Sequence, residues 1–247
     1  MKLTVLGNRS PYPIEGSGCS GYLLQTKQQN ILIDVGEGVL ERLNGIIDYH
    51  KLDAIIISHL HADHFLGLIP LQYAIMVAQK SGLREKPLDV YLPFETGAEL
   101  SYIQAKLGTE YNLEEINENK KLELGALEIN FQKTIHFKEC YGMMISNGEQ
   151  VLGYTADTAW SEDLIPFFSK TDLLLIEATL LEENIKAEQA GHMTVKQAVN
   201  FGIEANSKRM LLTHLRSTRQ EEEIVAEIPE TNINVEVSQV NKTYIID

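Results

Sequence analysis

Cysteine is scarce in this sequence, which has only Cys19 and Cys140 among 247 residues. Two cysteines cannot provide a disulfide framework for a chain of this length, and no Cys-x-x-Cys pair indicates a thiolate metal site or a redox motif. We therefore expect a reducing, cytoplasmic location. Internal repeats, low-complexity tracts and Gly/Ser-rich or Pro-rich linkers are also absent, so we expect residues 1–247 to form a single domain.

Long hydrophobic runs are absent as well. No apolar run approaches the roughly 18 residues that a membrane-spanning helix needs. The N-terminal run Leu3–Leu6 is far shorter than the hydrophobic region of a signal peptide. We expect neither a membrane span nor a secretory leader.

Basic residues are outnumbered, with 21 Lys and Arg against 35 Asp and Glu, which gives a net charge of −14 at pH 7. Proteins that bind nucleic acid mainly through its phosphates need a basic face. We therefore expect no strong nonspecific binding to nucleic acid and no association with anionic membranes.

Short apolar, often β-branched runs alternate with amphipathic stretches of helical period, a pattern typical of an α/β domain. The expected strands are Leu3–Leu6, Tyr22–Leu24, Ile31–Ile33, Ala54–Ile57, Val90–Leu92, Ile129–Ile135, Val151–Tyr154, Leu173–Ile176, Met210–Leu212 and Tyr244–Ile246. The expected helices are Glu37–Asp48, Leu66–Lys80, Phe94–Leu107, Ser161–Phe168, Thr194–Asn206 and Arg219–Ile228. Because no helix separates the first strands, we expect a mixed rather than a purely parallel sheet. The charged stretch Glu114–Glu123 is expected to be a solvated loop or helix end.

Metal-binding side chains are concentrated directly after the strand that ends at Ile57. The sequence there is SHLHADH, with three of the chain's seven histidines. The two-residue spacing puts His59 and His61 on one side of an extended segment, and the following turn lets Asp63 and His64 face a second ion. The alternative is a loop of solvated histidines with Asp63 as the N-cap of a helix. Three histidines and an aspartate within six residues favour the metal site.

Further potential ligands stand at the ends of other expected strands, at Asp34, His136, Asp157, Glu177 and His214. In open α/β sheets, ligands bind beyond the carboxyl ends of the strands, so these residues can converge. A donor count then gives two complete sites: His59, His61 and His136 for one ion, and Asp63, His64 and His214 for the other, with Asp157 bridging both and a hydroxide completing each shell. Imidazole and carboxylate ligands without thiolate suit two Zn²⁺ ions, and manganese or iron would also fit. His50 is expected to be a surface or helix C-terminal residue.

These motifs resemble those of the metallo-β-lactamase superfamily. The resemblance rests on SHLHADH followed by Phe65-Leu-Gly67, LIDVGEG with Asp34, His136, YTADT with Asp157 and LLTHLRSTR with His214, in that order. It covers nearly the whole chain. It implies a four-layer αββα sandwich of mixed α/β (α+β) class with a dinuclear metal site at one edge of the two sheets.

Three features are similar to the ribonuclease Z and phosphodiesterase branch of this superfamily. Ile176-Glu-Ala-Thr179 resembles its HEAT-type segment, Gly191-His-Met-Thr194 its downstream histidine motif, and Tyr141-Gly142 its glycine-containing strand. The resemblance implies that His192 is not a ligand. Instead, His192 would be held by Glu177 and would contact a phosphate oxygen or protonate a leaving group. Without the resemblance, His192 is a residue before a helix that starts with a Thr194–Gln197 capping box.

The chain also departs from the branch. Bacterial ribonuclease Z holds tRNA with a basic arm between the positions of His136 and Asp157, and here only the twenty residues 137–156 separate them. No arm fits in that length, so the chain resembles the compact, armless hydrolases of the branch. The second departure is Ala156, where the family often has glycine.

Some motifs have simpler explanations than catalysis. Residues 16–21 match GxGxxG, but a strand rather than a helix is expected to follow, so we expect no nucleotide cofactor. We expect this glycine loop to lie over the edge of the site, where Asn8, Arg9 or Ser10 could contact substrate. Cys140 is expected to be a packed thiol, because the chain offers no nearby base for it. Ser217-Thr-Arg219 fits either phosphate binding or a helix cap.

The sequence thus predicts a metal-dependent hydrolase that attacks a phosphodiester with a hydroxide between two zinc ions, with Asp63, His192 and Glu177 assisting catalysis. The substrate would be a small phosphodiester or RNA, and a homodimer is implied by the resemblance alone. The alternatives are a tRNA 3′-processing endoribonuclease proper, an acyl hydrolase that cleaves thioesters, lactones or β-lactams, and a metal-bound protein without enzymatic activity.

Overall fold

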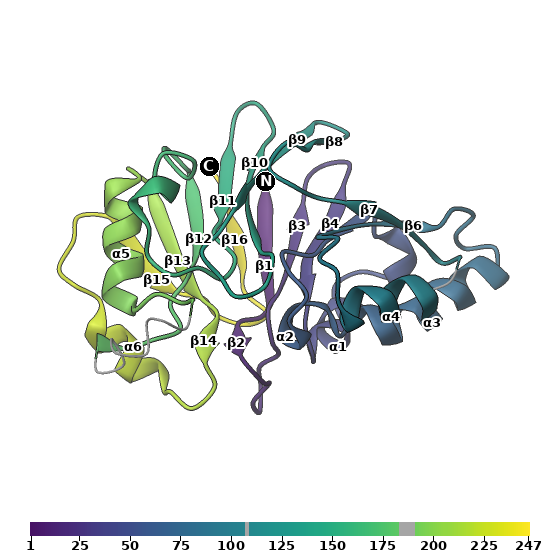
Figure 1. Ribbon diagram of the computed structural model, residues 1–247, viewed down its shortest axis with the longest axis horizontal. Helices are drawn as coiled ribbons and strands as arrows, with labels where there is room; N and C mark the ends of the chain where they lie inside the picture. The colour runs from purple at the N-terminus through teal and green to yellow at the C-terminus, as the bar shows by residue number, and fades with distance from the viewer. Residues whose placement is uncertain (107–108, 183–190) are drawn as a thin grey trace.

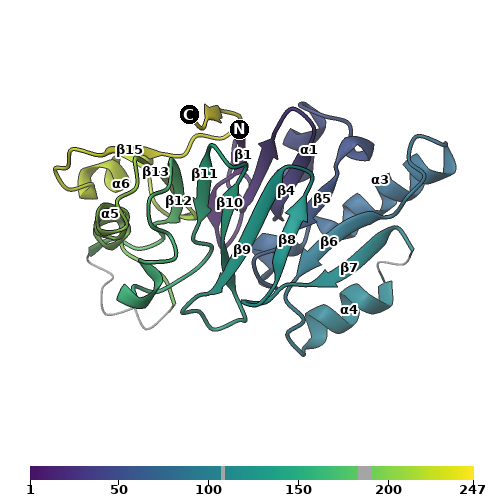
Figure 2. The ribbon, with the colours of Figure 1, turned by 90° about the horizontal axis from the view of Figure 1, so that it is seen from above.

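The fold consists of two β-sheets packed face to face, each covered by helices on its outer face (Figure 1). The computed structural model describes residues 1–106, 109–182 and 191–247. Figure 2 shows α5 and α6 on one flank of the sheets and α1, α3 and α4 on the other. This confirms the predicted αββα arrangement.

Within the described residues, the first sheet has seven strands in the order β16-β1-β3-β4-β5-β6-β7. Their bounds are Thr243–Ile245 (β16), Lys2–Gly7 (β1), Gly21–Gln25 (β3), Asn30–Val35 (β4), Ala54–Ile56 (β5), Leu88–Leu92 (β6) and Tyr111–Glu115 (β7). The pairs from β16 to β4 are antiparallel and those from β4 to β7 are parallel. The sheet is therefore mixed, as predicted.

The second sheet also has seven strands in the described part of the chain, in the order β15-β13-β12-β11-β10-β9-β8. Their bounds are Asn234–Val237 (β15), Arg209–Thr213 (β13), Leu173–Glu177 (β12), Val151–Tyr154 (β11), Tyr141–Ser146 (β10), Leu127–Lys133 (β9) and Lys121–Leu124 (β8). Two short strands, β2 (Arg9–Ser10) and β14 (Leu215–Arg216), pair in parallel between the two halves (Figure 1). This small ladder joins the N-terminal loop to the segment after β13.

The helices occupy the outer layers. They are α1 (Val39–Asn44), α2 (Ala62–Phe65), α3 (Leu68–Lys80), α4 (Ala98–Lys106), α5 (Val195–Glu204) and α6 (Glu221–Glu227), with the 3₁₀ turns η1 (Tyr49–Lys51) and η2 (Glu162–Leu164). In the described residues, no helix is long and apolar enough to cross a lipid bilayer.

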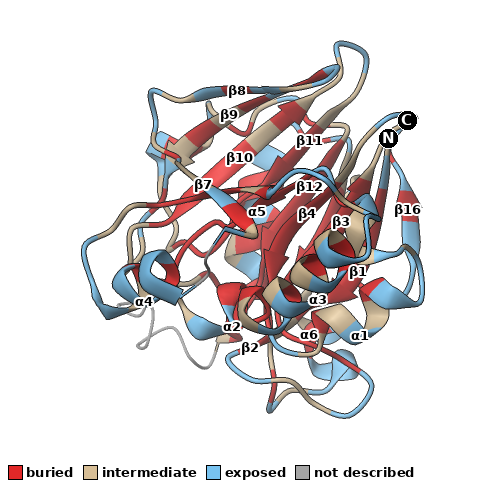
Figure 3. Ribbon diagram, turned by 90° about the vertical axis from the view of Figure 1, so that its right-hand side faces the viewer, coloured by how far each residue is buried: buried red, intermediate tan, exposed pale blue. Residues whose placement is uncertain are grey.

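Strands buried on both faces explain the continuous hydrophobic runs in the sequence. Alternate side chains such as Tyr22 and Ile33 of the first sheet meet Met143 and Leu175 of the second in the core between the sheets. The intervening residues of the first sheet pack under α1, α3 and α4, and those of the second pack under α5 and α6. Figure 3 accordingly shows strands buried along most of their length and helices exposed on their outer surface.

Some predicted elements were wrong. Ser161–Phe168 forms only the 3₁₀ turn η2, because Pro166 has no N–H for a helical hydrogen bond. Glu114–Glu123 is a loop only in its middle, since its two ends belong to β7 and β8. The helix predicted at Glu37–Asp48 is confined to α1 and ends at Gly45. The last residue of the predicted helix Phe94–Leu107 lies outside the described residues.

Candidate metal centre

The seven predicted metal ligands lie together at one edge of the two sheets. His59 and His61 follow β5, and Asp63 and His64 form the first turn of α2. The other three ligands come from the second sheet, namely His136 after β9, Asp157 after β11 and His214 after β13. Residues up to 155 positions apart in the sequence, His59 to His214, thus face one another, as the strand-end argument predicted.

The first group of ligand atoms comes from His59, His61, His136 and Asp157. One atom of each lies within 4.8 Å of the others. Nδ1 of His61 is 3.0 Å from Nε2 of His59 and 3.1 Å from Nε2 of His136. Oδ2 of Asp157 is 3.5 Å from Nε2 of His59. These donors surround a point, which is the arrangement a tetrahedral cation needs.

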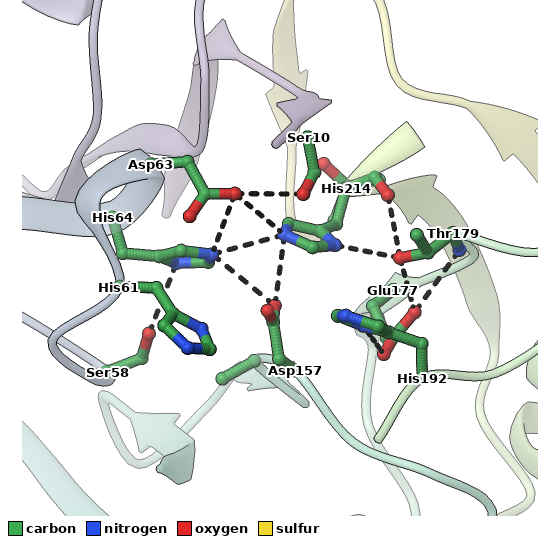
Figure 4. A network of polar contacts seen from close by, with 12 residues as sticks. Ser10, Ser58, His61, Asp63, His64, Asp157, Glu177, Thr179, His192 and His214 are labelled. Carbon is green, nitrogen blue, oxygen red and sulfur yellow. Dashed lines mark hydrogen bonds and ion pairs between the residues drawn. The ribbon is translucent and has the colours of Figure 1, made fainter. Parts of the chain in front are cut away.

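The second group comes from Asp63, His64 and His214, again with ligand atoms within 4.8 Å of one another. Nε2 of His64 and Nε2 of His214 are 3.1 Å apart. Oδ2 of Asp63 is 3.5 Å from Nε2 of His214. Figure 4 shows this group beside Asp157.

Asp157 faces both groups. Its Oδ2 belongs to the first group, and its Oδ1 is 3.4 Å from Nε2 of His64 and 3.3 Å from Nε2 of His214. Oδ1 is buried and accepts no hydrogen bond within the described residues. A buried carboxylate oxygen without a donor is costly unless a cation satisfies it. The residues present therefore fit a bridging carboxylate between two metal ions.

The outward-facing nitrogens of the histidines support the same conclusion. Nδ1 of His64 lies 2.8 Å from Oδ2 of Asp34, which can only accept, so the ring donates there and directs the lone pair of Nε2 into the site. Nδ1 of His136 likewise donates to the carbonyl of Gly191 at 3.0 Å. Nδ1 of His59 lies 3.1 Å from the hydroxyl of Ser58, whose own proton goes to Asp34. Lone pairs converging in this way repel one another unless a metal ion or a proton lies between them.

Burial and neighbouring charges divide the histidines into two kinds. Burial lowers the pKa of His59 well below its usual value, that of His61 to about 4, and that of His136 below its usual range. Burial also opposes the charge on His64, but Asp157 and Asp34 outweigh it and raise the pKa of His64 well above its usual value. The pKa of Asp157 is lowered, because the attraction of His214 and His64 exceeds the cost of burial. In the metal-free protein the three histidines of the first group are therefore neutral, whereas a proton stays on His64.

His192 and Glu177 form an ion pair beside the second group. Nδ1 of His192 donates to Oε1 of Glu177 at 2.9 Å, and this carboxylate is fully buried. A ring nitrogen of His192 lies within 4.8 Å of ligand atoms of Asp157 and His214. Although burial opposes the charge, Glu177 raises the pKa of His192 to about 9. His192 also precedes α5, whose first turn has the predicted capping box of Thr194 and Gln197.

One ligand and the residue before another ligand have unusual backbone conformations. His214 has φ 54° and Ala156 has φ 53°, both in the left-handed region that favours glycine. This conformation costs a non-glycine residue about 1–2 kcal/mol, which gives a physical reason for the glycine that the resemblance associates with position 156. Position 156 is alanine in this chain, and the adjacent Asp157 still lies among the other potential ligands.

The N-terminal loop approaches the site through Ser10, whose hydroxyl donates to Oδ2 of Asp63 at 2.8 Å. Asn8 is buried and bonds instead to Ser238 and Ser17. Arg9 donates to the backbone carbonyls of Arg216 and Arg219. The predicted contacts of these residues with substrate stay predictions.

Three further predictions concern the glycine loop, Cys140 and the residues that follow His214. The glycine loop is followed by β3 rather than by a helix, as expected for a chain without the dinucleotide fingerprint. Cys140 is fully buried, and burial raises the pKa of its thiol well above the usual value, so it packs as predicted. The hydroxyl of Ser217 donates to backbone carbonyls of the N-terminal loop, and α6 is capped by Gln220. The helix-cap alternative for residues 217–219 was therefore wrong.

Sequence reasoning missed the polar groups that hold the ligands. Ser58, Tyr154 and Thr179 were not singled out, although the first two donate to Asp34 and Thr179 contacts His214. Ser58 had a local signal in its position directly before the histidine motif, and Thr179 had one as the last residue of the HEAT-type segment. The contact of Tyr154 depends on strand packing that no short pattern encodes.

Comparison with known proteins places the chain in a family. The family model described as "Beta-lactamase superfamily domain" matches residues 29–215. The chain belongs to the metallo-β-lactamase superfamily. Among superfamily relatives, the probable metallo-hydrolase YhfI of Bacillus subtilis (strain 168) is 35% identical over 218 residues, covering 87% of each chain. The crystal structure of YhfI matches 98% of both chains with a TM-score of 0.90 and 31% identity.

The chain is also similar to ribonuclease Z enzymes. The ribonuclease Z of Picrophilus torridus is 26% identical, covering 87% of this chain and 86% of the relative. The crystal structure of the short form of human tRNase Z covers 100% of both chains with a TM-score of 0.79 and 20% identity, a likeness of fold alone. The predicted superfamily and its ribonuclease Z-like character are thus confirmed. In this chain residues 137–156 form mainly the β10–β11 hairpin, so no arm separates His136 from Asp157.

Proposed function

We propose that this metallo-hydrolase is a phosphodiesterase with two zinc ions in its site. The observation that carries the proposal is the His192–Glu177 pair, which puts a cationic imidazole within 4.8 Å of ligand atoms of both Asp157 and His214. Cleavage of a phosphodiester leaves negative charge on the phosphoryl oxygens and on the leaving oxygen, and a protonated imidazole serves both. The names of the ribonuclease Z relatives agree with this class of substrate.

The potential ligands divide into one set for each ion. His59, His61 and His136 would hold one zinc, Asp63, His64 and His214 the other, and Asp157 would bridge them. When bound, such a pair of ions supplies Lewis acidity and an ionised water as nucleophile at neutral pH. Manganese or iron would satisfy the same ligands.

The chain's own groups orient the reactants. Asp63, fixed by the hydroxyl of Ser10, would accept a hydrogen bond from the attacking water through its remaining oxygen. Nδ1 of His192 is committed to Glu177, so only its Nε2 can contact the substrate. With its pKa raised to about 9, His192 carries a proton at neutral pH and can donate it from Nε2 to the leaving oxygen.

The substrate we propose is a small phosphodiester or a short oligonucleotide. The net charge of −14 repels a long polyanion unless basic residues gather locally. The short hairpin between His136 and Asp157 offers no extra surface for tRNA. A homodimer and a cytoplasmic location remain predictions of the sequence.

The decisive experiment loads the full chain with zinc or manganese and measures hydrolysis of bis(p-nitrophenyl) phosphate, of a panel of thioesters and lactones, and of pre-tRNA. We expect phosphodiester hydrolysis that is lost in His61→Ala and Asp157→Ala together with bound metal. His192→Ala should lose turnover while it keeps its metal. Hydrolysis of acyl substrates that is unaffected by His192→Ala, with no phosphodiester cleaved, would replace the proposal with acyl hydrolysis. Efficient pre-tRNA cleavage would replace it with tRNA processing.

A further inference from the structure

The hydroxyl of Thr179 lies at a junction between the His192–Glu177 pair and the second ligand group (Figure 4). Its Oγ1 is 2.7 Å from Oε2 of Glu177 and 2.8 Å from Nδ1 of His214. The same oxygen is 3.0 Å from the backbone carbonyl of His214. Thr179 is buried, with 8% of its surface exposed, so water does not readily replace these contacts.

Hydrogen-bond accounting gives these contacts a direction. A threonine hydroxyl has one proton to donate and two lone pairs that accept. The carboxylate of Glu177 and the carbonyl of His214 only accept, so the hydroxyl proton goes to one of them, and Glu177 is nearer. Nδ1 of His214 must then donate to Oγ1, because two facing lone pairs at 2.8 Å would repel.

This direction fixes the tautomer of His214. A neutral ring that carries its proton on Nδ1 has its lone pair on Nε2, which is 3.3 Å from Oδ1 of Asp157 and 3.5 Å from Oδ2 of Asp63. The hydroxyl also contacts the carbonyl of a residue whose φ of 54° is unfavourable for histidine. Because its one proton goes to Glu177 rather than to this carbonyl, Thr179 acts on the ring of His214.

The same direction orients Glu177. Its Oε2 accepts a hydrogen bond from the hydroxyl of Thr179. Its Oε1 is then left to accept from Nδ1 of His192 and from the backbone N–H of Thr158 at 3.0 Å. His214 therefore donates to Thr179, and Thr179 donates to Oε2 of Glu177. His192 donates to Oε1 of the same carboxylate. In the described part of the chain, Nε2 of His192 makes no hydrogen bond and is left for the site.

We propose that Thr179 is a positioning residue that holds His214 ready for the second cation and, through Glu177, holds His192 in place beside the second ligand group. The inference rests on the proposed function for the identity of the reaction. The hydrogen-bonding argument itself concerns only this chain's residues. Loss of the hydroxyl should therefore weaken cation binding at the second group and slow turnover together.

The test uses Thr179→Val, which keeps the shape and removes the hydroxyl, and Thr179→Ser, which keeps the hydroxyl. Thr171→Val is the matched control. Thr171 is a buried threonine two residues before the start of β12, and among the described residues its hydroxyl bonds only to Ser207. Zinc affinity is measured by competition with a chelator. Proton NMR on ¹⁵N-labelled zinc-loaded protein follows the Nδ1 proton of His214 and its exchange with water.

We expect Thr179→Val to weaken binding of the second zinc about 10–100-fold, the usual effect of removing a partner of a metal ligand. In this variant the Nδ1 proton of His214 should exchange with water much faster than in the wild type. Thr179→Ser should restore both properties to within a few-fold, and Thr171→Val should change neither.

Wild-type affinity for both ions in Thr179→Val would overturn the inference. So would a Thr179→Ser variant as damaged as Thr179→Val, since the methyl group rather than the hydroxyl would then matter. If Thr179→Val does not fold, an unprotonated Nδ1 on His214 in the zinc-loaded wild type is enough to overturn it. If the wild type binds two ions but cleaves no phosphodiester, the proposed function fails while the affinity comparison still decides the role of Thr179.

Discussion

Lowering the pH from about 8 to about 6 should release a cation from one half of the site and leave the other half loaded. His61, with a pKa lowered to about 4, and His59, with a pKa well below its usual value, carry no proton in this range. His64 does carry one, because Asp157 and Asp34 raise its pKa well above the usual value. A cation that binds the second group must therefore displace a proton from Nε2 of His64, whereas one that binds the first group displaces none.

The size of the difference follows from proton linkage. Displacing one proton changes the apparent affinity about tenfold per pH unit, which is about 1.4 kcal/mol. At every pH below the raised pKa of His64, the second group should therefore lose about tenfold in affinity for each unit by which the pH falls. The sign is fixed, because a raised pKa in the metal-free state makes the proton a stronger competitor as the pH falls. The affinity of the first group should change less, because its three histidines have lowered pKa values.

Single-group variants make the two affinities separately measurable. His61→Ala removes a ligand of the first group only, and His214→Ala removes a ligand of the second group only. Chelator competition across the pH range gives each slope. Calorimetry in buffers of different ionisation enthalpy counts the protons released. Equal slopes for the two variants, or proton release on binding to His214→Ala, would refute the assignment of the proton to His64.

Three further predictions use the same side chains. His192→Gln should lower phosphodiester turnover about 10²–10⁴-fold, as expected for loss of a general acid, with both metals retained by elemental analysis; loss of metal would contradict its role. In the metal-free protein, the His192–Glu177 pair should stabilise the fold fully below about pH 6.5 and lose that contribution as the pH rises through about 9, since the folded-state pKa is the raised one; urea titrations at both ends should show the loss in the wild type and a flatter profile in His192→Gln. Tyr154→Phe removes the 2.7 Å hydrogen bond to the buried Asp34 and should cost about 1–3 kcal/mol of unfolding free energy in urea, and an unchanged free energy would contradict the stabilising role of this bond.

The sequence predicts strands well where both faces of a strand are buried. Such strands, for example β4 and β12, are continuous apolar runs that stand out from their surroundings. The edge strands β7 and β8 escape detection because charged side chains occupy their exposed positions. The 3₁₀ turn η2 was mistaken for a helix because amphipathic spacing says nothing about a missing N–H at Pro166.

The metal ligands could be predicted from the sequence, whereas the hydroxyl groups that hold them in place could not. Each ligand follows a recognisable strand, so the order of elements alone brings His59, His136 and His214 to one edge. The hydroxyls of Ser10 and Thr179 reach their partners 53 and 35 positions away. Serine and threonine are common at loops and strand ends, and only the packed strands decide which hydroxyl meets which imidazole or carboxylate.

The division of the ligands between the sheets has a consequence for a nicked chain. The first sheet is built from the N-terminal part of the chain with β16 as a C-terminal addition, and the second sheet begins at β8. A cut in the loop between β7 and β8 would leave two fragments that interlock through β16 at one edge and through any bound cation at the other. Such fragments should co-purify when loaded with zinc and separate more readily after chelation.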